Sequence, residues 1–309
     1  MHIAVMGSGA VGGYFGAKLA EAGHQVVFIA RGAHLEAMRR AGLRILSPDG
    51  NRHIQTAAFV ASAAEVSAVD LVLFCVKSYD TEAAAAALGP LIGAGTLILS
   101  LQNGVDNPTK LAGLWGGERI LAGVAYVGAQ LEAPGVIRHS SGGKIIFGPL
   151  DGAINTAVNG IERALSTAGI TCAISGNIQN VQWAKLLWNA PFCAISALAR
   201  VHTQQIVESE TLTQLALDCM AEVRAAALVQ GVELAAALFA ETIAFSRGLG
   251  PFKPSMLQDL EAGKALEYEA FNGIVVQLLE QAGQPAPINR TFYALLRQLN
   301  ENIRKEAGR

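Results

Sequence analysis

The chain begins with a glycine-rich motif of the form G-x-G-x-x-G, made by Gly7, Ser8, Gly9, Ala10, Val11 and Gly12. An apolar run, His2–Met6, precedes it and a helical pattern, Ala10–Ala22, follows, so the motif closes a strand and opens a helix. There Gly7 allows a tight turn, Gly9 lets the backbone approach a pyrophosphate, and Gly12 lets helix and strand pack closely. The helix N-terminus offers free N–H groups and partial positive charge. We therefore predict a dinucleotide site at residues 7–12, against the alternative of a glycine-rich turn without a ligand.

The end of the second apolar run, Gln25–Ala30, indicates which dinucleotide binds. An enzyme that uses NAD usually carries an acid there to hold the ribose 2′-hydroxyl. This chain has Arg31 instead, whose planar guanidinium suits a 2′-phosphate. The alternative is an ordinary solvated arginine. The pattern favours NADPH.

Two further polar residues follow apolar runs that read as parallel strands. Lys77 comes directly after Leu71–Val76, and Asn103 follows Thr96–Leu101. The carboxyl ends of parallel strands form the ligand crevice of a doubly wound sheet, so both are candidate binding residues. The alternatives are a plain strand-end lysine and an Asn-Gly turn.

A lysine and an asparagine interrupt an apolar helical pattern, Ile178–Leu198, further along the chain. Lys185 and Asn189 are four residues apart and share a face of that helix. Burying them costs free energy unless they have partners or a role. An amphipathic helix whose lysine reaches water is the alternative, and spacing alone does not choose between the two.

The elements that position these residues predict an N-terminal Rossmann-type, doubly wound α/β domain followed by an all-α domain. Short apolar runs alternate with helical patterns in the first half, as parallel sheets require. Strands Leu43–Ser47 and His53–Ala58 are predicted to form a hairpin across Pro48-Asp49-Gly50, and turns are predicted at Pro134-Gly135 and Gly142-Gly143. Beyond Gly176 the pattern is almost wholly helical. We expect a dinucleotide-binding domain at 1–176 and a catalytic domain at 177–309.

Composition excludes several classes of protein. Hydrophobic residues make up 51% of the 309 and charged ones 16%, which indicates a globular protein. The net charge of −2, without a basic run, argues against a nucleic-acid binder. No apolar stretch approaches the roughly 20 residues that span a bilayer. The four cysteines form no CxxC pair, and no metal-ligand spacing is present, so free thiols in a reducing cytoplasm are expected.

Taken together, these motifs resemble the ketopantoate reductase (2-dehydropantoate 2-reductase) family along nearly the whole chain. The resemblance depends on the order and spacing of Gly7–Gly12, Arg31, Val76-Lys77, Leu101-Gln102-Asn103-Gly104, Pro134-Gly135-Val136-Ile137, Lys185-x-x-x-Asn189, Pro254-Ser255-Met256-Leu257-Gln258-Asp259 and Glu267.

The resemblance implies NADPH-dependent reduction of a small 2-keto acid, 2-dehydropantoate to pantoate, in pantothenate biosynthesis. Lys185 matches the general acid, which gives a proton to the carbonyl oxygen as hydride arrives. Asn103 matches a residue near nicotinamide and substrate. Asn189 and Ser255 match substrate-binding groups, and Glu267 the acid near the nicotinamide ribose and the lysine. Ala129 aligns loosely with a backbone contact to the cofactor. From the residues alone, Ser255 could be only a helix N-cap and Glu267 a surface carboxylate.

Three positions depart from the family pattern. Cys193 and Thr203 stand where asparagine is common, which leaves the exact keto acid open. Asp80 stands where some members have glutamine, and its carboxylate would repel a 2′-phosphate unless it pairs with a cation. The alternatives are therefore a related hydroxy-acid dehydrogenase with another small substrate, or a non-catalytic NADPH-binding sensor. The alanine-rich second domain could supply a homodimer interface, which nothing in the sequence demonstrates.

Overall fold

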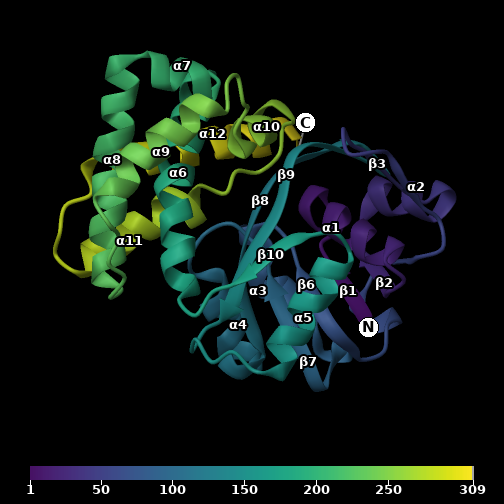
Figure 1. Cartoon of the computed structure of the whole chain (residues 1–309). Helices are drawn as coiled ribbons and strands as arrows, with labels where there is room; N and C mark the ends of the chain where they lie inside the picture. The colour runs from purple at the N-terminus through teal and green to yellow at the C-terminus, as the bar shows by residue number, and fades with distance from the viewer. Residues whose placement is uncertain (308–309) are drawn as a thin grey trace. The chain divides into compact units, whose positions relative to one another are not determined.

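The computed structural model describes residues 1–307 and divides into two compact units (Figure 1). The first comprises Met1–Asn103 and Asn107–Ile178, and the second comprises Gln179–Arg309 together with the short loop Gly104–Asp106. The chain thus passes from one unit to the other two residues after Gly176.

One ten-stranded sheet forms the centre of the first unit, in the order β4-β3-β9-β8-β7-β6-β1-β2-β5, with β10 paired to β9. The six strands β5-β2-β1-β6-β7-β8 are mutually parallel, which confirms the doubly wound α/β fold. The strands are β1 (His2–Met6), β2 (Gln25–Ile29), β3 (Leu43–Leu46), β4 (Arg52–Ile54), β5 (Ala58–Val60), β6 (Val69–Phe74), β7 (Ile92–Ser100), β8 (Ile120–Ala133), β9 (Val136–Pro149) and β10 (Thr171–Ile174).

Helices cover both faces of this sheet because its central strands are apolar on both sides. In β1, Ile3 and Val5 belong to the apolar cluster that includes residues of α1, α2 and α5, whereas Ala4 and Met6 belong to a second cluster that includes residues of α3 and α4. The helices of this unit are α1 (Ala10–Glu21), α2 (Gly32–Ala41), α3 (Thr81–Ala86), α4 (Asn107–Trp115) and α5 (Thr156–Thr167), with short 3₁₀ turns η1 (Ala63–Glu65), η2 (Ser78–Asp80), η3 (Gly89–Leu91) and η4 (Gly117–Arg119).

Two predicted boundaries in this sheet are wrong. Gly142-Gly143 is not a turn between strands but lies inside β9, where the pairing with β8 slips by one residue. Both glycines have positive φ, 76° and 116°, which suits the extra residue of a β-bulge. The predicted strand 53–58 is two strands, β4 and β5, which pair with different neighbours.

The second unit is helical around a single apolar core. None of the helices within residues 1–307 has the length and apolar character needed to cross a membrane. The elements are α6 (Ile178–Ala199), α7 (Thr203–Glu208), α8 (Glu210–Val229), α9 (Ala237–Gly248), α10 (Ser255–Glu261), the π-helical segment η5 (Glu269–Gly273), α11 (Ile274–Gln281) and α12 (Pro287–Ala307).

Candidate active site

The glycine motif forms the turn between β1 and α1, and two of its glycines are required by close backbone contacts. A Cβ at Gly7, where φ is +95°, would lie 2.7 Å from the Val76 nitrogen. A Cβ at Gly12 would collide with the Gly7 carbonyl oxygen and lie 2.9 Å from Val5 Cγ1. At Gly9 a Cβ would meet nothing within 4 Å. The turn is therefore tightly packed on its inner side and open at Gly9, the position where a pyrophosphate would approach.

Ser8 contributes to the turn rather than to the open space. Its side chain is 1% exposed, and both its hydroxyl and its amide donate to the Ile29 carbonyl, at 3.0 and 3.1 Å. The N–H groups of Ala10 and Val11, in the first turn of α1, have no acceptor within a helix, so they are the donors that this terminus offers an anion.

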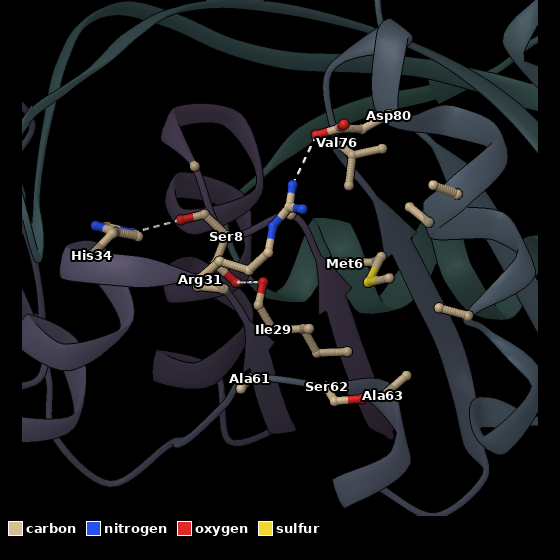
Figure 2. Close-up of a pocket in the computed structure, with 16 residues that line it drawn as sticks. Met6, Ser8, Ile29, Arg31, His34, Ala61, Ser62, Ala63, Val76 and Asp80 are labelled. Carbon is tan, nitrogen blue, oxygen red and sulfur yellow. Dashed lines mark hydrogen bonds and ion pairs between the residues drawn. The ribbon is translucent and has the colours of Figure 1, made fainter. Parts of the chain in front are cut away.

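A pocket of about 420 Å³ lies beside this turn (Figure 2). Gly7 and Gly9 line it, together with Arg31 from the end of β2 and Asp80 from the start of α3. The Arg31 guanidinium donates to the Asp80 carboxylate at 2.8 Å. Asp80 thus pairs with a cation, which the sequence left open.

His34 is a pocket residue that the sequence did not single out. Its Nε2 donates to the Ser8 carbonyl at 2.8 Å, and its Nδ1 accepts from the Gly135 N–H at 2.9 Å. These two partners require the neutral ring with its proton on Nε2. His34 therefore ties the glycine turn to the tip of the β8–β9 hairpin, a contact across 101 positions that no local pattern could indicate.

The other candidates of the first unit lie outside the lining of this pocket. Lys77 directly follows the lining residue Val76, and Ala129 is a half-buried residue of β8 opposite His139. Asn103 follows β7 in a loop held by buried polar groups. Its carbonyl accepts from Asn107 Nδ2 at 2.7 Å. Asn107 Oδ1 lies 2.9 Å from the Thr81 hydroxyl, which accepts from Gln102 at 2.7 Å.

Helix α6 carries Lys185, Asn189 and Cys193 in the second unit. Lys185 is partly buried, and burial lowers the pKa of its ammonium to about 8. Cys193 is fully buried, and burial raises the pKa of its thiol to about 12, so the thiol stays neutral at physiological pH. Asn189 is 5% exposed on the intervening turn.

Ser255 and Glu267 belong to the same cluster. The Ser255 side chain and the Met256 N–H both hydrogen-bond to Cys193. Glu267 and Lys185 are near enough to change the pKa of the same thiol, which the carboxylate raises and the ammonium lowers. Ser255 is not the N-cap of α10, because Pro254 occupies that position and Ser255 begins the helix. Glu267 is only 5% exposed and is therefore not a surface carboxylate.

Thr203 is a structural residue of this unit. It is fully buried, and its hydroxyl and amide donate to the Phe252 carbonyl at 3.0 and 2.9 Å. These bonds fix the segment that leads into Ser255. The hydroxyl thus already has an acceptor within the protein.

Both units match known proteins. Residues 3–152 match the family described as ketopantoate reductase PanE/ApbA, and residues 177–300 match its C-terminal domain. A 2-dehydropantoate 2-reductase of Mesorhizobium japonicum is 32% identical over 97% of this chain and 98% of its own length. This chain belongs to the ketopantoate reductase family. It is accordingly an oxidoreductase that acts on a CH–OH group, in a family that depends on NAD(P)H.

Solved ketopantoate reductases have the same fold. The PanE/ApbA family enzyme of Ralstonia eutropha JMP134 is 34% identical, with a TM-score of 0.91 over 98% of this chain and 100% of that one. The 2-dehydropantoate 2-reductase of Geobacter metallireducens GS-15 is 31% identical, with a TM-score of 0.92 over 96% and 99%.

The residues of this member of the family fit a dinucleotide. The space at Gly9 is open, the first turn of α1 offers N–H donors, and the pocket beside it carries the cationic Arg31. These features could receive a pyrophosphate and the adenosine half of the cofactor.

A buried polar network supports helix α6 and was not foreseen from the sequence. Asn272, in η5, donates through Nδ2 to the Ala190 carbonyl at 3.2 Å and to Asn289 Oδ1 at 2.9 Å. Ala190 immediately precedes Pro191, which lacks an N–H and interrupts the hydrogen bonding of α6. Glu222 accepts from the Ile288 and Asn289 amides at 2.8 Å, at the start of α12. The network therefore joins the segment after Glu267 to the helix that carries Lys185.

Proposed function

We propose that this chain reduces 2-dehydropantoate to pantoate with NADPH and that Lys185 is the general acid. The observation that carries the proposal is the partly buried ammonium of Lys185, in one cluster with Cys193, Ser255 and Glu267, in a member of this family. A sensor that only binds NADPH would not need such a group.

The roles of the residues follow from charge. NADPH, when bound, supplies the hydride. Negative charge then develops on the carbonyl oxygen of the keto acid, and the Lys185 ammonium stabilises that oxygen and donates its Nζ proton to it. Asn189 and Ser255 would hold the hydroxyl and carboxylate of the substrate, Asn103 would lie near the nicotinamide, and Glu267 would orient the lysine and the ribose.

A related activity, the reduction of another small 2-keto acid, is the second candidate, and Cys193 favours it. A neutral thiol is a poor partner for a hydroxyl or carboxylate, so this part of the cluster is less polar than an asparagine would make it. Oxidation of NADPH with a panel of 2-keto acids separates the outcomes. Preference for 2-dehydropantoate supports the first proposal, preference for another keto acid supports the second, and NADPH binding without turnover indicates a sensor.

The pKa of Lys185 predicts the pH above which kcat/KM for keto-acid reduction begins to fall. The ammonium must be protonated to act as an acid, and its protonated fraction falls as the pH rises through about 8. We expect kcat/KM for keto-acid reduction to fall about tenfold per pH unit above this value, because one proton is lost. Rates between pH 6 and 10.5 at saturating NADPH test this. A limb that begins near 10.5, the ordinary lysine pKa, would contradict the assignment.

Arg31→Ala is expected to weaken NADPH binding about 30-fold and NADH binding less than about threefold. The reason is that charge-assisted hydrogen bonds to the 2′-phosphate, worth about 2 kcal/mol, would be lost. Titration calorimetry with both nucleotides measures the two Kd values. Arg40→Ala, at an exposed position of α2, the helix that begins directly after Arg31, is the control. An equal loss for both nucleotides would refute the role of Arg31.

A further inference from the structure

Asp80 makes an ion pair that its position in the chain does not explain. It is the residue before α3 and the N-cap of that helix, where an aspartate ordinarily accepts from the N–H groups of the first turn. Its side chain makes no such bond. The carboxylate instead turns into the pocket, where it accepts from Arg31 at 2.8 Å across the space between β2 and α3 (Figure 2).

These two residues are the only ones with a full charge among the pocket-lining residues that the structure describes. The Arg31 and Asp80 side chains are 79% and 37% exposed, so their ion pair is weak and can exchange for another partner. A 2′-phosphate that binds Arg31 must displace the carboxylate and then lie close to its negative charge. A 2′-hydroxyl carries no charge and can donate a hydrogen bond to a carboxylate.

We propose that Asp80 is a specificity-determining residue that weakens the preference for NADPH and lets the site accept NADH as well. It does so in two ways: it competes with the 2′-phosphate for Arg31, and it offers an acceptor for the 2′-hydroxyl at a pocket where β2 ends without an acid. This inference rests on the proposed use of NADPH. It adds that Arg31 and Asp80 together, rather than Arg31 alone, determine how strongly the site prefers NADPH to NADH.

The test is Asp80→Asn, with Kd measured for NADPH and NADH by titration calorimetry on the full chain in the absence of keto acid. Asparagine has nearly the same shape as aspartate, and the Asp80 side chain makes no capping bond to lose, so α3 is preserved. We expect NADPH to bind about tenfold more tightly, because a competing acceptor and a repulsive charge are both removed. NADH should bind about threefold more weakly, because a neutral amide is a poorer acceptor for the 2′-hydroxyl.

Glu82→Gln is the matched control, since it removes the same charge two residues further along, from an exposed side chain outside the pocket lining. It should change the ratio of the two Kd values less than twofold. Asp80→Ser, which also removes the negative charge and keeps a polar side chain at the start of α3, should shift the ratio in the same direction as Asp80→Asn.

The outcomes separate this inference from the proposed function. If the natural chain binds NADPH and both Asp80 variants keep its NADPH to NADH ratio within twofold, the role of Asp80 is refuted while the proposed function stands. If the natural chain binds neither nucleotide, both are refuted.

Discussion

Lys185→Met is expected to lower kcat for keto-acid reduction by about 10³-fold or more while the Kd for NADPH changes less than twofold. A general acid contributes about 10²–10⁴-fold, and the same ammonium also stabilises the developing negative charge. Methionine has a similar length and no charge, so the apolar surroundings of α6 accept it. Its burial should even be easier, because burial already disfavours the lysine's charged form and lowers its pKa to about 8.

Two controls distinguish proton donation from general damage. Lys305→Met removes a charge from an exposed position on α12 and should leave kcat unchanged. Lys185→Arg keeps the positive charge but cannot release a proton near neutral pH, so it should bind NADPH normally and lose the alkaline limb near pH 8. Single-turnover NADPH oxidation measures these rates. Retention of more than a tenth of the activity by Lys185→Met would exclude it as the acid.

Gly12→Ala is expected to lower the stability of the first unit, whereas Gly9→Ala is expected to lower its affinity for NADPH and leave its stability nearly unchanged. The new Cβ at Gly12 would meet the Gly7 carbonyl oxygen, Val5 Cγ1 at 2.9 Å and Cys75 Cβ at 3.0 Å. The start of α1 cannot move away from Val5 and Cys75 without loosening the packing of the helix on the sheet. We therefore expect the free energy of unfolding to fall by about 3 kcal/mol. The new Cβ at Gly9 meets nothing within 4 Å, and φ there is −71°, so the fold should lose less than about 1 kcal/mol.

The affinity for NADPH should fall mainly in Gly9→Ala, the variant whose stability is nearly unchanged. Gly9→Ala places a methyl group where the pyrophosphate is expected to approach the backbone, so we expect binding to weaken at least about 100-fold with little change in Tm. Denaturant unfolding and calorimetry measure the two quantities on each variant. Unchanged NADPH affinity in Gly9→Ala would show that the dinucleotide does not approach this turn.

The fold class was predictable because its signals are local. Strands such as β1 and β6 are apolar on both faces, which only a sheet covered by helices on both sides satisfies, and the glycine motif marks the first turn of such a sheet. The slip inside β9 was not predictable, because paired glycines mark a bulge as readily as a turn and the partner strand decides between them.

The sequence by itself determined the doubly wound fold, the glycine turn and the shared face of Lys185 and Asn189, because each depends on residues within a few positions of one another. Tertiary structure alone decided that Asp80 pairs with Arg31, 49 positions away, and that His34 joins Ser8 to Gly135. It also decided the pKa of Lys185, because desolvation depends on every element packed around the ammonium rather than on its own helix.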